Sequence, residues 1–413
     1  MAIDQQANPD TVRAVDWTAL FAARTRAEIG PGLASILALA NATDLISFSG
    51  GFPDPATFPG PILAEILAEI VTSGDSTALQ YGPTRGLPGP RAFVADRLAQ
   101  RENRRPAEDE LAITSGGIEA LELLGKSFLD PDDVVLVEAP TYLGAIMAFR
   151  SFQANVIGVP VDEAGLDVDG IGAAIARQGR PKLLYAIPDH QNPTGVSMAS
   201  ERRQALVDLA RRHGFLIVED VAYRELGFDD DRPPSLWTIG PDVVVQSGTF
   251  SKTFFPGVRL GWAAGPAPVV EQMVLAKQNT DQCAGALGQR LLEEYGRRGG
   301  LEEQAGRARA LYGRRCALLM EALATHMPAG VRWTHPRGGF FSWVTVTAGL
   351  DTVELASRAL DRRVAFVPGR PFFADGSGGN TLRLAFSRID DGDIDEGVRR
   401  LAEVVAGALG DQR

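Results

Sequence analysis

Short apolar runs rich in β-branched residues alternate with helical stretches from residue 111 onward. No other feature constrains the fold as strongly. The runs cover residues 111–114, 133–138, 155–159, 182–187, 214–219 and 243–247. Helical patterns follow most of them, as at 117–128 and 200–213. Strands that alternate with helices form a parallel sheet covered by helices on both faces. The sequence therefore predicts an α/β fold with a mainly parallel sheet in a large three-layer domain.

Three polar residues come shortly after predicted strands. Asn192, Asp220 and Lys252 each fall a few residues beyond the end of an apolar run. The runs at 134–137, 215–218 and 243–245 are apolar throughout, as buried strands should be. Ligands of such sheets bind beyond the carboxyl ends of the strands. We therefore expect the three side chains to converge on one rim of the sheet.

The rest of the chain predicts a second, smaller α+β domain. Helical patterns at 269–297 and 298–326 should carry the chain to it. Strands are expected there at 330–333, 339–346, 364–367 and 381–386, with helices at 351–361 and 391–408. We expect residues 1–45 to form an N-terminal arm and part of the small domain. Residues 46–321 then form the large domain, and residues 322–413 the small C-terminal domain.

Composition excludes several classes of function. The net charge of −11 disfavours nucleic acid and anionic membranes as partners. No apolar run reaches membrane-spanning length, and the first residues lack the pattern of a signal peptide, so we expect a cytoplasmic protein. The two cysteines and four scattered histidines suggest neither a disulfide framework nor a metal site.

The segment at 247–261 carries the strongest chemical signal. Lys252 lies between two hydroxyl residues, with Thr249 before it and Arg259 seven residues after it. A lysine that loses its proton near neutral pH can form a Schiff base with an aldehyde cofactor, of which pyridoxal 5'-phosphate (PLP) is the usual one. Arg259 and Thr249 would then bind the phosphate. A solvated surface lysine is the alternative, and the three phenylalanines at 250, 254 and 255 argue against it.

This segment resembles the active-site lysine motif of the PLP-dependent aminotransferases of class I/II, which have PLP fold type I. Four further segments resemble motifs of that family in the expected order: residues 113–121, 188–195, 218–226 and 380–387. They are similar to its phosphate-binding turn, its Asn-Pro-Thr-Gly signature, its Asp-x-Ala-Tyr segment and its carboxylate-binding arginine segment. Residues 47–55 and 79–83 are typical of the subgroup that contains 2-aminoadipate and broad-specificity aminotransferases.

The resemblance implies a role for each matching residue. Lys252, Asp220 and Tyr142 are the implied catalytic residues: the Schiff-base lysine and general base, the partner of the pyridine nitrogen, and the aromatic residue that stacks on the cofactor ring. The implied cofactor-binding residues are Gly116, Gly117, Ile118, Tyr142, Asn192, Asp220, Tyr223, Thr249, Ser251, Lys252, Arg259 and Tyr81. The implied substrate-binding residues are Arg383, Asn192 and Gly51.

The resemblance has two further implications, one for assembly and one for phosphate binding. Tyr81 resembles a residue that reaches the phosphate of the neighbouring subunit, which implies a homodimer with shared active sites. The family often has hydroxyl or amide side chains at the positions of Gly117 and Ile118. Their absence leaves more of the phosphate binding to backbone N–H groups, Thr249 and Arg259.

The implied reaction moves the amino group of an L-amino acid to a 2-oxo acid, with pyridoxamine phosphate as the intermediate. β-Elimination, decarboxylation, cyclisation or oxidation would use the same lysine, aspartate and arginine. A PLP-sensing regulator would need a DNA-binding domain before the Gly50–Gly51 loop, where the sequence leaves about 45 residues. A further alternative is a relative without catalytic activity, and the presence of all the motif residues argues against it.

Substrate choice depends on the N-terminal segment. Acid-specific members of the subgroup carry an arginine that faces the substrate side chain. Counting back from Gly50 and Gly51, Ala34 falls at that position, and Arg24 and Arg26 are out of register. The sequence therefore favours neutral, aromatic or basic side chains over acidic ones in the amino donor.

Overall fold

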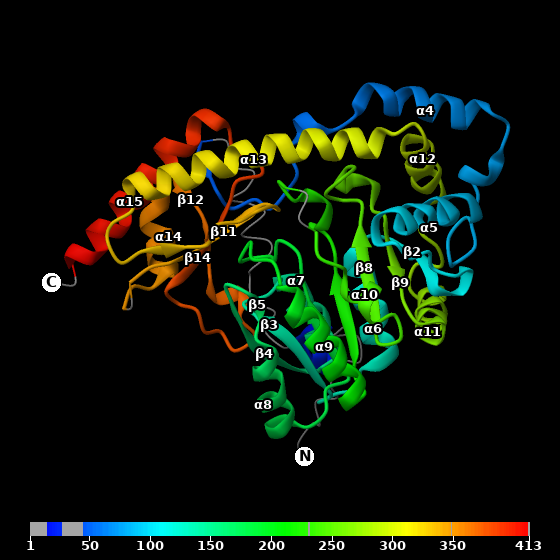
Figure 1. Cartoon of the computed structure of the whole chain (residues 1–413), viewed down its shortest axis with the longest axis horizontal. Coiled ribbons are helices and arrows are strands. Elements are labelled where there is room, and N and C mark those ends of the chain that lie inside the picture. Colours follow the sequence, from blue (N-terminus) through cyan, green and yellow to red (C-terminus); the bar gives the residue numbers. More distant parts are fainter. Residues whose placement is uncertain (1–14, 27–43, 230–231, 348, 412–413) are drawn as a thin grey trace, which may run out of the picture.

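An eight-stranded sheet forms the centre of the molecule, which the computed structural model describes for residues 15–26, 44–229, 232–347 and 349–411. The strand order is β2-β9-β8-β7-β6-β3-β4-β5 (Figure 1). The strands are β2 (Leu111–Thr114), β3 (Val134–Ala139), β4 (Asn155–Asp162), β5 (Gly165–Leu166), β6 (Leu183–Ala186), β7 (Leu216–Asp220), β8 (Val244–Thr249) and β9 (Gly261–Ala264).

The sheet is mainly parallel, as the sequence predicts. The pairs β4–β3, β3–β6, β6–β7 and β7–β8 are parallel, so these strands share one carboxyl edge. The edge pairs β8–β9, β9–β2 and β4–β5 are antiparallel. The apolar pattern did not reveal β9, because its four residues, Gly-Trp-Ala-Ala, include no β-branched side chain.

Successive residues of the central strands enter two different cores. Val135 and Val137 pack on the side of α6, α7 and the long α13, whereas Leu136 packs on the side of α8, α9 and α10. Both faces of the sheet are therefore covered, which accounts for the unbroken apolar runs in the sequence. The helices of this part of the chain are α4 (Gly60–Thr72), α5 (Pro88–Glu102), α6 (Gly117–Phe128), α7 (Leu143–Ser151), α8 (Val168–Gln178), α9 (Ser200–His213), α10 (Leu236–Ile239), α11 (Ala267–Gln278), α12 (Ala286–Arg297) and α13 (Gly300–His326).

Helix α13 runs along one side of the molecule toward a second, smaller sheet (Figure 1). That sheet has the order β10-β11-β14-β13 and is antiparallel. Its strands are β10 (Arg332–Trp333), β11 (Phe341–Thr345), β13 (Val367–Pro368) and β14 (Thr381–Ala385), accompanied by helices α14 (Thr352–Asp361) and α15 (Ile394–Asp411).

The predicted strand at 364–367 is divided in two. Residues Val364–Ala365 form β12, which pairs in parallel with β1 (Ile46–Ser47), while β13 pairs with β14. The chain at β1 thus lies against C-terminal elements, although residues 46–47 fall in the range predicted for the large domain. The domain boundaries at residues 45 and 321 remain predictions.

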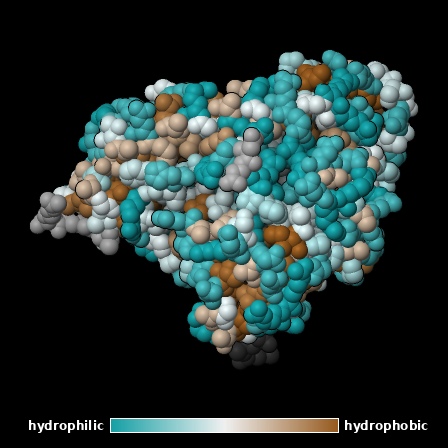
Figure 2. All heavy atoms as spheres, in the orientation of Figure 1, coloured by the Kyte–Doolittle hydropathy of each residue, from teal (hydrophilic) through white to brown (hydrophobic). Residues whose placement is uncertain are grey.

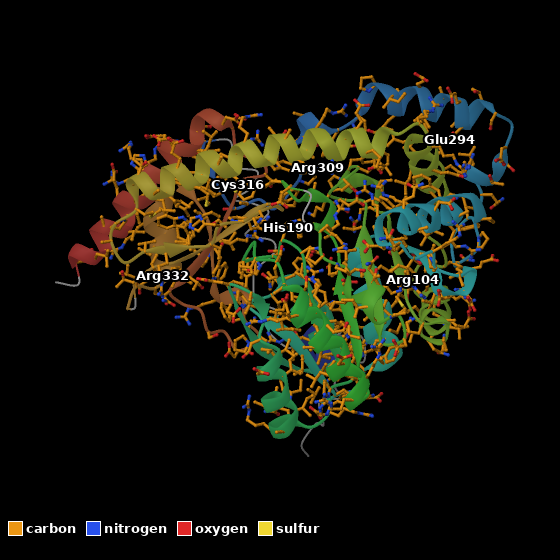
Figure 3. All side chains as sticks on the ribbon, in the orientation of Figure 1. Arg104, His190, Glu294, Arg309, Cys316 and Arg332 are labelled. Carbon is orange, nitrogen blue, oxygen red and sulfur yellow. The ribbon has the colours of Figure 1, made fainter. Side chains whose placement is uncertain are left out.

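The face shown in Figure 2 is mostly hydrophilic, with scattered apolar patches. None of the helices in the described ranges is long and apolar enough to cross a membrane. No group of three or more His, Cys, Asp or Glu side chains in those ranges could hold a metal ion. Both cysteines are free, and Cys316 is buried on α13 (Figure 3).

Candidate active site

A cavity of about 270 Å³ lies at the carboxyl edge of the large sheet. The predicted site residues that line it are Gly51, Gly117, Ile118, Tyr142, Asn192, Asp220, Tyr223, Thr249, Ser251, Lys252, Arg259 and Arg383. Gly116 adjoins it through Arg259, and Tyr81 does not line it. Asp220 is the last residue of β7. Tyr142 follows β3, Asn192 follows β6 and Lys252 follows β8. Parallel strands thus bring side chains from four distant segments to one place.

Lys252 lies inside this cavity with its charge poorly solvated. Its Nζ donates a hydrogen bond of 3.1 Å to the carbonyl oxygen of Gly51 and lies 5.9 Å from the centre of the Tyr223 ring. Burial lowers the pKa of Lys252 to about 8, and the positive charge of Arg383 adds to the effect against the opposing charge of Asp220. The side chain is therefore available as an uncharged amine close to neutral pH.

Gly51 is the residue that this close approach requires. A Cβ atom at position 51 would lie 2.7 Å from Cζ of Phe341, closer than real Cβ atoms come to their neighbours. Any other residue would have to displace the Phe341 ring from the wall of the cavity. Gly51 therefore keeps its carbonyl oxygen next to Lys252.

Asp220 is held by two hydrogen bonds at the end of β7. The Tyr185 hydroxyl donates to its Oδ2 at 2.8 Å, and the backbone N–H of Ala222 donates to its Oδ1 at 3.0 Å. Burial raises the pKa of Asp220, while these two hydrogen bonds and Lys252 act to lower it. Asp220 thus offers a fixed, half-buried carboxylate that can face a cationic group.

Tyr185 is a functional residue that the sequence reasoning missed. It lies fully buried on β6, in the middle of an apolar run. A hydroxyl-bearing side chain in a buried strand needs a partner, and this requirement is the signal that could have revealed it.

The start of α6 forms a cradle for an anion. Gly116 has φ +98°, and a Cβ atom there would lie 2.7 Å from the Arg259 guanidinium. No described side chain caps the N-terminus of α6. Its backbone N–H groups therefore face outward, together with the positive end of the helix dipole. Thr249 donates to the Ser251 hydroxyl at 3.0 Å, and Arg259 contacts Ser251 at 3.4 Å. Together they surround the turn with donors and one cation.

Arg383 is a buried guanidinium with spare donor capacity. One nitrogen donates to Asn192 Oδ1 and another to the Ser49 carbonyl oxygen, both at 3.0 Å, while Nε has no partner. Its guanidinium carbon lies 4.3 Å from the centre of the Phe341 ring. Burial lowers the pKa of Arg383 to about 10. Within the described residues no carboxylate pairs with it, so the arginine is ready to bind a small anion.

Tyr142 fits against α7 because the second residue of that helix, Gly144, has no side chain. A Cβ atom at Gly144 would lie 2.4 Å from the Tyr142 ring. Burial raises the pKa of Tyr142, so its hydroxyl stays protonated and can donate a hydrogen bond.

The residues present fit PLP. The cavity offers an amine for its aldehyde, an anion cradle for its phosphate, a half-buried carboxylate for its ring nitrogen and an aromatic wall for its ring. The Arg383 guanidinium offers a separate cation, which has no carboxylate partner among the described residues.

Comparisons with known proteins agree with this geometry. The family model "Aminotransferase class I and II" matches residues 43–401. The chain is 40% identical over 378 residues to 2-aminoadipate transaminase of Thermus thermophilus, covering 91% of this chain and 93% of the relative. It is 35% identical over 397 residues to aromatic-amino-acid aminotransferase 1 of Thermococcus litoralis, covering 95% of each. The kynurenine aminotransferase of Pyrococcus horikoshii, crystallised with PMP, superposes with a TM-score of 0.91 at 37% identity, covering 95% of this chain and 98% of that one.

Proposed function

The chain belongs to the aminotransferase class I and II family, and from that premise we propose that its amino donors carry neutral, large apolar or aromatic side chains. The protein is a PLP-dependent enzyme that transfers an amino group from an amino acid to a 2-oxo acid. When bound, PLP supplies an aldehyde for the donor amine and a ring that accepts the electron pair released at the substrate Cα. The observation that carries the proposal is the wall of the cavity.

That wall is largely apolar, and each charged side chain in its described lining already has a proposed role toward the cofactor or the substrate carboxylate. Phe52, Ile118, Leu143, Pro256 and Phe372 line the part of the cavity left by the polar residues. In the described lining, the only cations are Lys252, Arg259 and Arg383, and the only acid is Asp220. A donor side chain with a carboxylate or an ammonium group would therefore lose water without gaining a partner.

The N-terminal segment bears on the same point. Ala34, the residue that we expect in place of a side-chain-reading arginine, lies outside the described residues, as does the side chain of Arg26. The aromatic-amino-acid aminotransferase among the relatives favours the proposal, whereas 2-aminoadipate transaminase represents the acidic alternative.

We propose the following roles for the residues of the site. Lys252 holds PLP through Nζ and, once the donor has taken its place, moves the proton at the substrate Cα. Asp220 keeps the proton on the ring nitrogen, and Tyr185 stabilises the ionised form of Asp220. Arg383 binds the substrate carboxylate bidentately. Asn192 uses its Oδ1 on Arg383, so its amide nitrogen is left to donate.

We further propose a homodimer to which each chain contributes Tyr81. The Tyr81 side chain is 78% exposed and does not line the cavity of its own chain. Leu67 and Val71 on α4, and Leu79 just before Tyr81, are also exposed apolar residues. Such a group of exposed apolar side chains is typical of a surface that a partner covers.

The test is a half-reaction screen, in which single amino donors convert the PLP form to the pyridoxamine form without any 2-oxo acid. We expect phenylalanine, leucine and methionine to exceed glutamate and 2-aminoadipate by more than about tenfold in kcat/KM, since an unpaired buried charge costs about 2–5 kcal/mol. If 2-aminoadipate were the fastest donor, the proposal would be wrong.

A further inference from the structure

A buried lysine outside the cavity lies behind the phosphate turn. Lys277 on α11 has a side chain that is 1% exposed. Its Nζ lies 2.7 Å from both carboxylate oxygens of Glu119 on α6 and 2.7 Å from both of Asp281. One cation thus balances two anions, of which Glu119 is buried with Lys277 whereas Asp281 lies at the surface. We name Ser115, Glu119, Lys277 and Asp281 the Lys277 cluster.

Both carboxylates of the cluster also hold Ser115. Glu119 Oε2 accepts the backbone N–H of Ser115 at 2.6 Å, and Asp281 Oδ2 accepts its hydroxyl at 2.6 Å. The carbonyl oxygen of Ser115 accepts a long hydrogen bond of 3.4 Å from Arg259 on the side of the cavity. The next residue, Gly116, takes φ +98° and begins the turn into α6. Ser115 is therefore fixed from both sides at the point from which the phosphate turn starts.

Stability alone is a weak reason for such a cluster. A buried ion pair gains little over apolar side chains of the same volume, because both charges must leave water. No residue of the cluster lines the cavity. The turn itself has Gly117 and Ile118, whose side chains offer no donors to a phosphate. Binding of the phosphate therefore depends strongly on where the backbone N–H groups of the turn point.

The charge of the cluster also faces the phosphate site. Glu119 lies in the first turn of α6, whose N-terminus forms the cradle. Without Lys277, two carboxylates would stand unpaired behind a site that must hold a dianion. Of the cations that the structure describes there, Arg259 is on the cavity side and Lys277 on the protein side.

We propose that the Lys277 cluster positions the phosphate turn for PLP, and that Lys277 neutralises the two carboxylates that would otherwise repel the phosphate group. Ser115, Glu119, Lys277 and Asp281 are positioning residues in this account. They act through the backbone of Ser115 and Gly116 without touching the cofactor.

The experiment compares PLP with pyridoxal, which lacks the phosphate. Binding of each to the full-length apoenzyme is followed by absorbance, without any turnover. For Lys277→Met we expect PLP affinity to fall by more than about tenfold, as is usual when one partner of a buried charge pair is removed. Pyridoxal affinity should change by less than about twofold. The variant Glu119→Gln/Lys277→Met/Asp281→Asn keeps acceptors for Ser115 without the charges and should recover most of the loss.

Two further variants make the test specific. Glu122→Gln removes a half-buried carboxylate on the same helix, outside the cluster, and should bind PLP as the parent protein does. Ser115→Ala removes only the link to Asp281, so it addresses the same proposal if Lys277→Met does not fold. It should weaken PLP binding severalfold and leave pyridoxal unchanged. Equal losses for PLP and pyridoxal, or no recovery in the triple variant, would overturn the proposal.

Discussion

The hydroxyl of Tyr185 donates a 2.8 Å hydrogen bond to Oδ2 of Asp220 across two neighbouring parallel strands. This contact joins the carboxylate that we assign to the PLP ring nitrogen to a residue that lies fully buried in the sheet. The neighbouring strand thus helps to fix the position and the charge of Asp220, together with the backbone N–H of Ala222 in the loop after β7.

Replacing Tyr185 by phenylalanine should raise the pKa of Asp220, because the hydrogen bond stabilises the ionised form. Asp220 works as a carboxylate, so activity would then be lost at a higher pH as the solution is acidified. We expect the acid limb of the kcat profile to move to higher pH and kcat to fall by roughly ten- to a hundredfold, since one hydrogen bond to a charged group contributes about 1.5–3 kcal/mol. Tyr295→Phe is the matched control, since its buried hydroxyl bonds Gln304 away from the cavity. An unchanged acid limb in Tyr185→Phe would contradict this role.

The pKa of Lys252 predicts how the rate depends on pH. A base acts when deprotonated, and a pKa lowered to about 8 puts that form within reach at neutral pH. The half-reaction rate should therefore rise with pH up to about 8 and then level off. The charge of Arg383 lowers this pKa, so Arg383→Gln should move the rise to higher pH. Stopped-flow absorbance at saturating donor measures it, and a rate that falls between pH 6.5 and 8 would exclude Lys252 as the base.

Loss of Arg383 should act mainly on substrate binding. Arg383→Gln removes the buried cation assigned to the donor carboxylate, and KM for the amino donor should rise by more than about tenfold. Affinity for PLP should stay near that of the parent protein, because Arg383 is not placed at the cofactor. Amines without a carboxylate serve as the comparison, since their slow reaction should be unaffected at a pH high enough to deprotonate Lys252 in both proteins. A KM that does not change would show that another residue binds the carboxylate.

Tyr81 should matter only in the assembled dimer. Light scattering at assay concentration should give twice the mass of one chain, and Tyr81→Phe should bind PLP more weakly without loss of assembly. Mixed dimers of Tyr81→Phe with Lys252→Ala chains provide a sharper measurement. One of their two sites would then combine both defects and the other neither, so half of the activity should return. A fully active monomer would rule out the shared site.

The sequence predicted the parts of the site that depend on local order along the chain. Asn192, Asp220 and Lys252 follow apolar strands, and strands of one direction bring such residues to one rim. The sequence could not predict contacts between segments that lie far apart along the chain. Tyr185 and Asp220 are 35 residues apart, and Lys277 and Glu119 are 158 apart, so no spacing links them. The sequence did not predict strand β9, because this strand lacks β-branched residues and its antiparallel pairing depends on its neighbours.

The cytoplasmic location and the domain boundaries are predictions from sequence. Ala34 lies outside the described residues, so its place relative to the donor side chain is a prediction as well. The donor screen tests this last point without further structural information.

The most direct test of the whole account is chemical labelling of Lys252. Reduction of the PLP-loaded protein with borohydride fixes the cofactor to the lysine that holds it, and peptide mapping by mass spectrometry identifies that residue. We predict one labelled peptide, with the modification on Lys252 and none on Lys277 or any other lysine. Lys252→Ala should bind PLP without any reducible linkage. A label on a different lysine would contradict the assignment of the cavity and the roles built on it.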